Sequence, residues 1–342
     1  MTDVLIVGAG VAGLACAKVL VQAGKTVRLL ERSRGVGGRC ATRRIEGQPV
    51  DHGLVFLHGQ SSDFLAALRE VPGQWLNGWP IVVSGNGTPC QPRAFLPGTH
   101  RLAHANGLSA FPKHLAVGLD VVLNTTVTGF DFGGDGSTVL AKQLDKSIAF
   151  TARDVVIALA GPQALALLNS LPVSPGRESA RALLAMLPSV PCATVIALYP
   201  RDVPLPRWDI LYPETSEALL LVAHDSAKRK DPAHTALVLQ ARPTWSGKRL
   251  TTPESDWAPR LLAAAAEQIG PWVAQPTTWQ AHLWRYARPN PDSELAGPLV
   301  MDLGRGRRVG LAGELFAPGG GVQAAWHSGG QLALRLLDPT HP

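Results

Sequence analysis

A glycine-rich segment near the start of the chain has the residue types and the spacing of a dinucleotide-binding turn. Its six residues are Gly8, Ala9, Gly10, Val11, Ala12 and Gly13. In such a turn the first glycine permits a tight bend, the second lets the backbone approach a pyrophosphate, and the third lets the following helix pack closely on a strand. The free N–H groups at the start of that helix attract the phosphates. The segment therefore predicts a bound dinucleotide.

An acid stands where a dinucleotide-binding fold contacts the adenosine ribose. Glu31 ends an apolar stretch that begins at Lys25, and its carboxylate can accept hydrogen bonds from the ribose hydroxyls. A charge-assisted bond of this kind contributes about 1.5–3 kcal/mol. The same negative charge disfavours a 2′-phosphate. These two motifs allow FAD and NAD equally.

A basic, glycine-rich loop directly after Glu31 separates the two cofactors. It runs to Arg39 and offers Arg32, Gly38 and Arg39 as further contacts. Backbone N–H groups and an arginine can approach a pyrophosphate here a second time. An NAD dehydrogenase does not need such an extension, whereas an FAD bound in extended form does. The loop therefore favours FAD.

A third glycine-rich segment lies near the end of the chain. A predicted strand ends at Gly313 and Glu314, and a predicted helix, Gly321 to Leu337, begins at a glycine run. Glu314 can bind a polyhydroxyl chain such as ribityl. The helix start, with Val322 and Gln323, would direct N–H donors towards the N1–C2=O edge of a reduced flavin.

The elements that must hold these motifs alternate in type along the chain. A strand from Asp3 to Val7, a helix from Val11 to Ala23 and the strand ending at Glu31 form a βαβ unit. Short alternating runs between 120 and 159, with a glycine turn at 133–136, predict an antiparallel meander. Further strands are predicted at Val190 to Tyr199, Ala218 to Ala223, Thr235 to Ala241, Thr277 to Trp284 and Arg307 to Ala312, a helix at Glu254 to Ile269, and loops with short strands at Gln74 to Gly98. We expect an α/β chain whose two ends build one dinucleotide domain around an inserted second domain.

Composition and charge narrow the class of protein. The 342 residues are 46% hydrophobic and 17% charged, which is typical of a globular chain. The formal charge of +6 could attract anions, and the densest basic cluster lies beside the dinucleotide motifs. We therefore assign that cluster to phosphates and expect no nucleic-acid partner.

The cysteines and the N-terminal residues bear on location. The four cysteines show neither a CxxC pair nor metal-ligand spacing, which predicts a reduced, cytoplasmic protein without a metal site. The apolar run Val4 to Val21 is interrupted by glycines and lacks a preceding positive charge. We expect neither a signal peptide nor a membrane span there.

Further segments are typical of one flavoprotein family: Gly37 to Arg44, Asp51 to Gly53, Phe111 to Ala116, Thr244 to Ser246 and His282 to Ala287. Through them, over nearly its whole length, the chain resembles the renalase branch of the flavin-containing amine oxidase superfamily. The resemblance implies a glutathione-reductase-type Rossmann FAD-binding domain with an inserted α+β substrate domain of mixed or antiparallel sheet and helices. It implies residues 1–70, 101–168 and 296–342 for the FAD-binding domain, residues 71–100 and 169–295 for the substrate domain, and the backbone of Val127 against the adenine.

The resemblance also implies a reaction. A small-molecule substrate would give a hydride to flavin N5, and O₂ would reoxidise the flavin to yield H₂O₂. For bacterial renalases the implied substrates are the 2- or 6-dihydro isomers of NAD(P)H, whose oxidation forms an aromatic pyridinium without an acid or base. Because the final predicted helix contains no cysteine, we expect the FAD to be non-covalent.

Two segments depart from the family pattern. The family usually has Ala-Gln-Tyr-Phe after Asp51 to Gly53, where this chain has Leu54 to His58. It usually has Gly-Asp and later Glu-Gly-Ala, where this chain has Gly313-Glu314 and Gln323 to Ala325. Glutamate should still bind ribityl. The first change touches the flavin's substrate face, so the identity of the substrate stays open.

Three side chains are candidates for a catalytic role. Trp284 either faces the flavin or joins the core, and His58, like His52, either flanks the isoalloxazine or is structural. Lys228 either holds a water at N5, as a lysine does in some amine oxidases, or lies in a solvated turn. The alternatives to a renalase-type enzyme are a flavin amine oxidase or desaturase, and a non-catalytic binding protein with the FAD fold.

Overall fold

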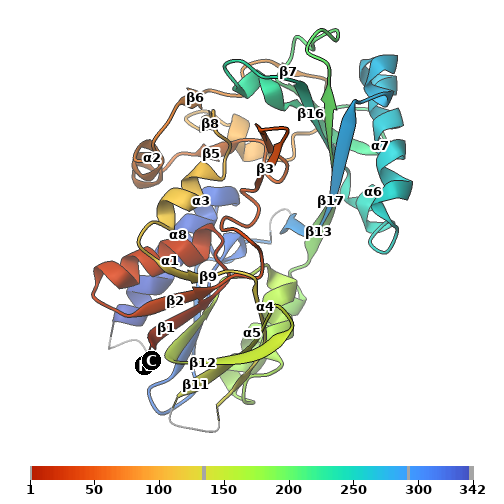
Figure 1. The fold of residues 1–342 in the computed structure, drawn as a ribbon. Helices are drawn as coiled ribbons and strands as arrows, with labels where there is room; N and C mark the ends of the chain where they lie inside the picture. The colour runs from red at the N-terminus through yellow and green to blue at the C-terminus, as the bar shows by residue number, and fades with distance from the viewer. Residues whose placement is uncertain (1, 133–135, 291–292, 339–342) are drawn as a thin grey trace. The chain divides into compact units, whose positions relative to one another are not determined.

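The structure, a computed structural model, describes residues 2–132, 136–290 and 293–338. The chain forms two compact units, whose elements are labelled in Figure 1. The first unit comprises Met1–Gly38, Phe111–Ser189 and Pro289–Pro342, and the second comprises Arg39–Ala110 and Val190–Arg288. The glycine motifs near both ends of the chain thus belong to the same unit, as predicted.

A parallel sheet forms the centre of the first unit. Its strands are β1 (Thr2–Val7), β2 (Val27–Leu30), β9 (Asp120–Val122), β12 (Lys146–Ile157) and β19 (Arg308–Leu311). They lie in the order β9-β2-β1-β12-β19, and helix α1 (Val11–Gln22) connects β1 to β2. This is the strand order of a Rossmann sheet, which confirms the predicted βαβ unit and the fold class.

An antiparallel meander extends the same sheet. Strand β10 (Thr125–Asp131) pairs with β11 (Ser137–Gln143), which pairs in turn with the first half of β12. On the other side, β18 (Leu299–Asp302) lies antiparallel to β19. The predicted meander is confirmed for β10, β11 and β12, whereas residues 120–122, which were predicted as part of it, form β9 of the parallel sheet. Residues 133–135 of its glycine turn lie outside the described residues.

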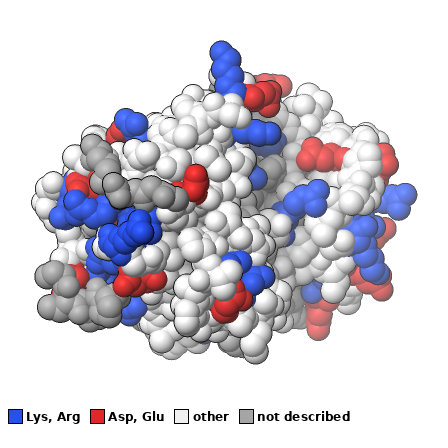
Figure 2. Space-filling view, turned by 90° about the horizontal axis from the view of Figure 1, so that it is seen from below, with Lys and Arg blue, Asp and Glu red and all other residues white. Residues whose placement is uncertain are grey.

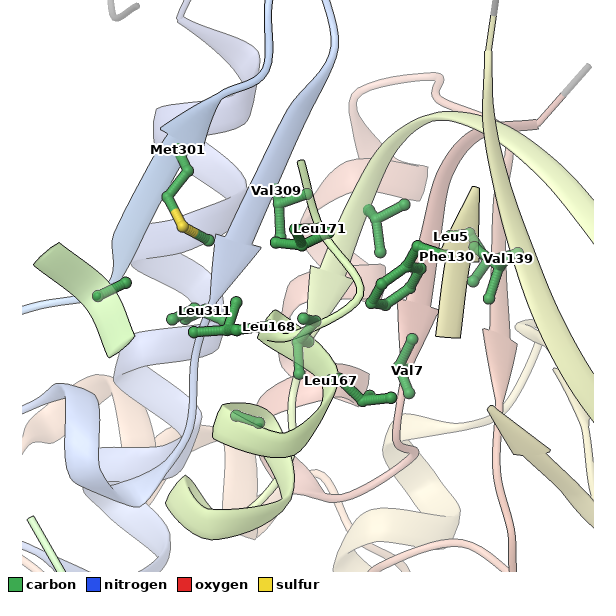
Figure 3. Packing of buried hydrophobic residues seen from close by; sticks show 14 of the residues in the cluster. Leu5, Val7, Phe130, Val139, Leu167, Leu168, Leu171, Met301, Val309 and Leu311 are labelled. Carbon is green, nitrogen blue, oxygen red and sulfur yellow. The ribbon is translucent and has the colours of Figure 1, made fainter. Parts of the chain in front are cut away.

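Helices cover the sheet of the first unit and close its core. Helix α4 (Gly161–Leu168) and helix α5 (Pro175–Ala185) supply apolar side chains to one buried cluster, and helix α8 (Gly321–Leu337) packs along α1. Figure 3 shows Leu167 and Leu168 of α4 in that cluster with Val7 of β1 and Leu311 of β19. The sequence patterns did not predict α4 and α5, whereas α8 has the predicted bounds.

A second, six-stranded sheet forms the centre of the second unit, in the order β17-β13-β16-β15-β14-β7. Its strands are β7 (Val83–Ser84), β13 (Ser189–Tyr199), β14 (Ile210–Leu211), β15 (Leu219–His224), β16 (Thr235–Ala241) and β17 (Thr278–Pro289). Alternate residues of β13 enter two clusters, because successive side chains point to opposite faces. Val195 and Ala197 pack with helix α7 (Glu254–Ile269), while Ile196 and Leu198 join the other cluster.

Smaller elements complete the second unit. A hairpin of β3 (Thr42–Ile45) and β4 (Gln48–Asp51) and a three-stranded sheet of β5 (Leu57–Gly59), β8 (His100–His104) and β6 (Trp75–Asn77) lie in this unit. The other helices and turns of the second unit are α2 (Ser62–Arg69), α6 (Pro243–Gly247), and the 3₁₀ turns at Pro92–Phe95, Asp225–Lys228 and Pro271–Ala274. Helix α3 (Ala110–Leu115) lies where the chain passes back into the first unit. The predicted loops and short strands between Gln74 and Gly98 are confirmed.

The boundaries of the two units differ from the domains implied by the resemblance. Residues 39–70 and 101–110 lie in the second unit, and residues 169–189 and 289–295 lie in the first. Ile45 and Val50 of the β3–β4 hairpin are buried in the same cluster as residues of β13, which explains the first difference. Leu184 of α5 is buried in the core of the first unit, which explains the second.

The surface and the helices give two further findings. On the face drawn in Figure 2, Lys and Arg side chains are interspersed with Asp and Glu side chains rather than gathered in one broad basic area. Within the described ranges, the helices are all too short or too polar to cross a membrane.

Candidate functional site

The first glycine turn of the first unit leaves no room for side chains at two positions. Gly8 has a φ of +101°, and a Cβ atom there would lie 2.7 Å from the carbonyl oxygen of Ala158. A Cβ at Gly13 would lie 2.1 Å from the carbonyl oxygen of Gly8. The turn between β1 and α1 therefore requires glycine at both places, as the motif predicted.

Gly10 differs, because the space around it is open. It is the N-cap residue of α1, and a Cβ built there would meet no atom of the described chain within 4 Å. The first turn of α1 contains no acidic residue, and no side chain of the described residues caps it. The N–H groups at this helix start can therefore bind an anion that approaches the backbone closely. The geometry fits a pyrophosphate.

Glu31 links the glycine turn to the basic loop that follows it. Its Oε2 accepts a hydrogen bond from the N–H of Ala9 at 2.9 Å, and its Oε1 accepts one from Ser33 at 2.7 Å. The N–H of Gly37 donates to the carbonyl of Ala9 at 2.8 Å. The two predicted cofactor motifs are thus in direct contact, with a carboxylate between them.

The C-terminal motif joins this group within the first unit. Helix α8 packs so closely on α1 that a Cβ at Gly329 would lie 2.1 Å from the carbonyl oxygen of Ala12. Glu314 accepts a hydrogen bond at Oε1 from the N–H of Gly321, the first residue of α8, at 2.8 Å. Gly313 donates its N–H to Ser328 Oγ at 2.8 Å. The middle of α8 therefore lies against the start of α1, and Glu314 lies at the start of α8 in the same unit.

The other predicted cofactor contacts are more dispersed. Gly38 lies beside the first turn, since a Cβ on it would be 3.7 Å from the Cα of Gly10, and Arg32 is exposed. Val127 is half-buried on β10. This strand begins at Thr125, whose N–H donates a hydrogen bond to the carbonyl of Glu31. Val322 is buried and Gln323 half-buried in the first turn of α8.

Arg39, by contrast, belongs to the second unit. Its Nη1 donates to the carbonyl oxygen of Ala287 at 3.1 Å, and its own carbonyl accepts a hydrogen bond from Leu54 at 3.0 Å. The predicted role of this arginine at a pyrophosphate stays a prediction.

Four charged side chains form a buried ion cluster in the second unit. Lys228 Nζ lies 2.6 Å from Asp51 Oδ2 and also pairs with Asp225. Arg229 Nη2 lies 2.8 Å from Asp225 Oδ2 and 3.2 Å from Asp51 Oδ2. The side chains are at most 5% exposed. Two positive and two negative charges balance one another, which is the condition for burying charge at tolerable cost.

This cluster fastens several segments of the second unit together. Asp51 Oδ1 accepts hydrogen bonds from Thr42 Oγ1 at 2.6 Å and from the N–H of Leu108 at 2.8 Å. Lys228 also donates to the carbonyl of Val55 at 3.1 Å, and its ammonium lies 4.9 Å from the ring centroid of Trp79. The ammonium of Lys228 therefore has several partners within the second unit. The alternative in which Lys228 lies in a solvated turn is wrong.

Acid should destabilise the protein through Asp51. Burial alone would raise the pKa of this carboxyl, but Lys228 and Arg229 outweigh burial and lower the pKa to about 2. An aspartate in an unfolded chain titrates near 3.9. Because the folded value is the lower one, the stabilisation is complete above about pH 5 and is lost as the pH falls through about 4 towards 2. Urea midpoints between pH 6 and pH 3 should fall more steeply for the wild type than for Asp51→Asn, and equal slopes would contradict the assignment.

The catalytic candidates occupy different places in the second unit. Trp284 lies on β17, and its Nε1 donates to the carbonyl oxygen of His52 at 3.1 Å. His282 lies on the same strand, and its ring centroid is 4.3 Å from that of Trp284. His58 is buried on β5, where its ring lies 6.5 Å from that of Phe56.

Sequence reasoning left out the partners of these residues. The ion cluster joins residues 51 and 225 to 229, and the aromatic group joins residues 52 and 282 to 284, so no local pattern connects them. One signal was available: His282 and Trp284 alternate on a predicted strand, which places both on the same face.

Comparison with known proteins supports a flavin-dependent function. Residues 6–71 match the model of an NAD(P)-binding Rossmann-like domain, and residues 85–337 match that of the flavin containing amine oxidoreductases. The putrescine oxidase of Kocuria rosea is 39% identical over 69 residues, a match that covers 20% of this chain and only 14% of that enzyme.

Two solved structures share the fold at low sequence identity. Cyclohexylamine oxidase from Brevibacterium oxydans IH-35A superimposes with a TM-score of 0.69 at 15% identity, covering 98% of this chain and all of the other. Wild-type putrescine oxidase bound to putrescine superimposes with a TM-score of 0.67 at 16% identity, covering 98% and 99% of the two chains.

These matches confirm the predicted fold class, the flavin cofactor and the wider superfamily of oxidoreductases. The second family model spans about three quarters of the sequence. The chain therefore belongs to the flavin containing amine oxidoreductase family.

Proposed function

We propose that the chain is an FAD-dependent oxidase or dehydrogenase of renalase type that oxidises a misreduced nicotinamide dinucleotide. The observation that carries the cofactor assignment is the open helix start at Gly10 beside the carboxylate of Glu31. Bound FAD supplies the acceptor for a hydride from the substrate, and O₂ is the acceptor that would then form H₂O₂.

Each part of the cradle in the first unit has a partner in FAD. The start of α1 would bind the pyrophosphate, Glu31 the ribose hydroxyls and the backbone of Val127 the adenine. Glu314 would bind the ribityl chain, and the start of α8 would donate to the N1–C2=O edge. Helix α8 contains no cysteine, which supports a non-covalent flavin. The four free thiols agree with our expectation of a cytoplasmic protein.

The charges near His52 favour an anionic substrate over a protonated amine. Arg43 Nη2 lies 3.5 Å from His282 Nδ1 and supplies a cation to this group of the second unit. The carboxylate of Asp51, which precedes His52, is neutralised by Lys228 and Arg229. A nicotinamide dinucleotide offers phosphates to an arginine and a flat ring to aromatic side chains.

Amine oxidation is the second candidate function. It is favoured by the putrescine oxidase match and by the fold shared with cyclohexylamine oxidase.

Anaerobic mixing of the holoenzyme with 2- and 6-dihydro-NAD, putrescine and cyclohexylamine separates the candidate functions. We expect only the dihydronicotinamides to bleach the flavin absorption band. Bleaching by the amines alone would overturn the substrate class, and tightly held flavin that nothing reduces would favour a binding protein.

Replacing Glu31 by glutamine should weaken FAD binding about tenfold, since a charge-assisted hydrogen bond becomes a neutral one. Titration of the deflavinated protein with FAD measures the change, and Glu267→Gln on an exposed position of α7 is the matched control. Equal dissociation constants for wild type and Glu31→Gln would show that this carboxylate does not contact the cofactor.

A further inference from the structure

A pocket of the second unit is formed by helix α2 and the small three-stranded sheet of β5, β8 and β6. Its volume is about 130 Å³, and the residues that line it belong to α2, β6 and β8 (Figure 1). An apolar cavity of about 150 Å³ is large enough to hold a benzene molecule. The pocket therefore has room for about one six-membered ring, and its lining includes neither a predicted cofactor contact nor a catalytic candidate.

Helix α2 contributes one face to the pocket. Leu68 and Arg69 follow Leu65 by three and four residues, the spacing that places side chains on the same face of a helix. The two leucines are at most 7% exposed, whereas Arg69 is exposed. The helix therefore gives the pocket an apolar base and a cation at its opening.

The sheet presents one of its faces to the same pocket. Trp75 and Asn77 alternate on β6, and His100 and Leu102 alternate on β8. Asn77 lies opposite Leu102 in the antiparallel register, and residues opposite one another point to the same side of a sheet. Leu102 is buried and completes an apolar floor with the two leucines of α2. The half-buried Trp75 adds an aromatic wall, and the exposed Asn77 and His100 add polar groups at the opening.

The charge of the pocket is positive and unbalanced. Within the described part of the chain, the side chains of Arg69, Asn77 and His100 make no hydrogen bond and no ion pair. No acidic residue is among those that line the pocket. A guanidinium binds a carboxylate through two parallel hydrogen bonds, and the pairing strengthens beside apolar surface that excludes water. The pocket is therefore complementary to an apolar ring that carries a carboxylate.

Two other classes of ligand fit this lining less well. An ammonium ion would meet the guanidinium of Arg69 without an acid to compensate it. A phosphate has no apolar body, so it would leave the leucine floor and the indole of Trp75 in contact with water. The combination of one cation with an apolar floor thus favours a small aromatic acid.

We infer that this pocket binds a small aromatic carboxylate such as benzoate. The ring lies on the leucine floor beside Trp75, and the carboxylate pairs with Arg69. Asn77 and His100 can donate further hydrogen bonds at the opening. The inference does not depend on the proposed function, because it uses only residues of α2, β6 and β8.

Calorimetric titration of the flavin-loaded protein with benzoate tests the inference. We expect a dissociation constant of about 0.1–1 mM, which is reasonable for a ligand with so few atoms. Benzamide has the same ring and a similar shape without the charge, so it should bind roughly tenfold more weakly or worse. Benzoate that bound no tighter than benzamide, or that did not bind at about 10 mM, would overturn the assignment.

Two variants locate the binding site. Arg69→Gln removes the charge at an exposed position, so it should weaken benzoate binding about 10- to 100-fold and abolish the preference for benzoate over benzamide. Asn77→Phe introduces a ring at the opening of the pocket and should prevent both ligands from binding. Its urea midpoint should equal or exceed that of wild type, because the added ring covers apolar surface.

Arg260→Gln is the matched control for the loss of charge. Arg260 is exposed on α7 of the same unit and does not line the pocket, so this variant should bind benzoate like wild type. Benzoate should also raise the urea midpoints of wild type and Arg260→Gln but not that of Arg69→Gln. Equal affinities of Arg69→Gln and Arg260→Gln, or benzoate binding that Asn77→Phe leaves unchanged, would place the ligand outside this pocket and overturn the inference.

Discussion

Replacing Gly10 by alanine should leave the protein folded but weaken FAD binding roughly 100-fold or more. A Cβ at this position meets no described atom within 4 Å, so the methyl group costs the folded chain little. The same methyl group occupies the space through which a pyrophosphate would approach the start of α1. Flavin retention after gel filtration and the dissociation constant of the deflavinated protein measure the effect.

Gly176 offers the matched control for this prediction. It lies in the first turn of α5, in the same unit, and a Cβ there would make only an ordinary contact of 3.6 Å with Met301. Gly176→Ala should keep both the fold and the flavin. If Gly10→Ala retained FAD as well as Gly176→Ala does, the pyrophosphate could not lie at this helix start. If Gly10→Ala failed to fold, the folded chain itself would require the space next to Gly10, and a ligand could not occupy it.

Replacing Lys228 by methionine should destabilise the second unit by about 3–5 kcal/mol. The change leaves the buried carboxylates of Asp51 and Asp225 with Arg229 as their remaining partner in the cluster, and an uncompensated buried charge is costly. The lysine side chain is completely buried, so water cannot replace its ammonium without opening the structure. Urea unfolding, followed by tryptophan fluorescence, measures the loss.

An exposed ion pair provides the comparison for Lys228. Arg201 and Asp231 lie 2.5 Å apart, but their side chains are 64% and 76% exposed. Arg201→Met should therefore change stability by no more than about 1 kcal/mol. A Lys228→Met protein of normal stability that oxidised its substrate slowly would contradict the structural assignment, and would favour the alternative in which this lysine acts at flavin N5.

The parts of the fold that could be predicted are those specified by local spacing. Gly13 is required by its contact with Gly8 in the same turn, Gly8 has a positive φ there, and Glu31 follows them at the end of the next strand. The helices Glu254–Ile269 and Gly321–Leu337 have their predicted bounds, because each carries a long apolar stripe and a clear stop. Helix α4 escaped prediction because its 8 residues give a weak periodic signal, whereas α5 escaped although Ser174 caps it and Pro175 opens it.

The parts that could not be predicted depend on residues far apart in the chain. Asp51 meets Lys228 across 177 positions, and His52 meets Trp284 across 232. An isolated lysine in a polar stretch resembles a solvated turn, and only the folded structure shows two carboxylates around it. The unit boundaries have the same origin, because the β3–β4 hairpin is assigned to the second unit by packing with β13.

A crystal structure of the flavin-loaded protein tests the cofactor assignment most directly. We expect one FAD per chain, with its pyrophosphate at the start of α1 next to Gly10, a ribose on Glu31 and the ribityl chain near Glu314. A flavin bound away from both helix starts, or a pyrophosphate out of hydrogen-bonding reach of the α1 N–H groups, would contradict the account.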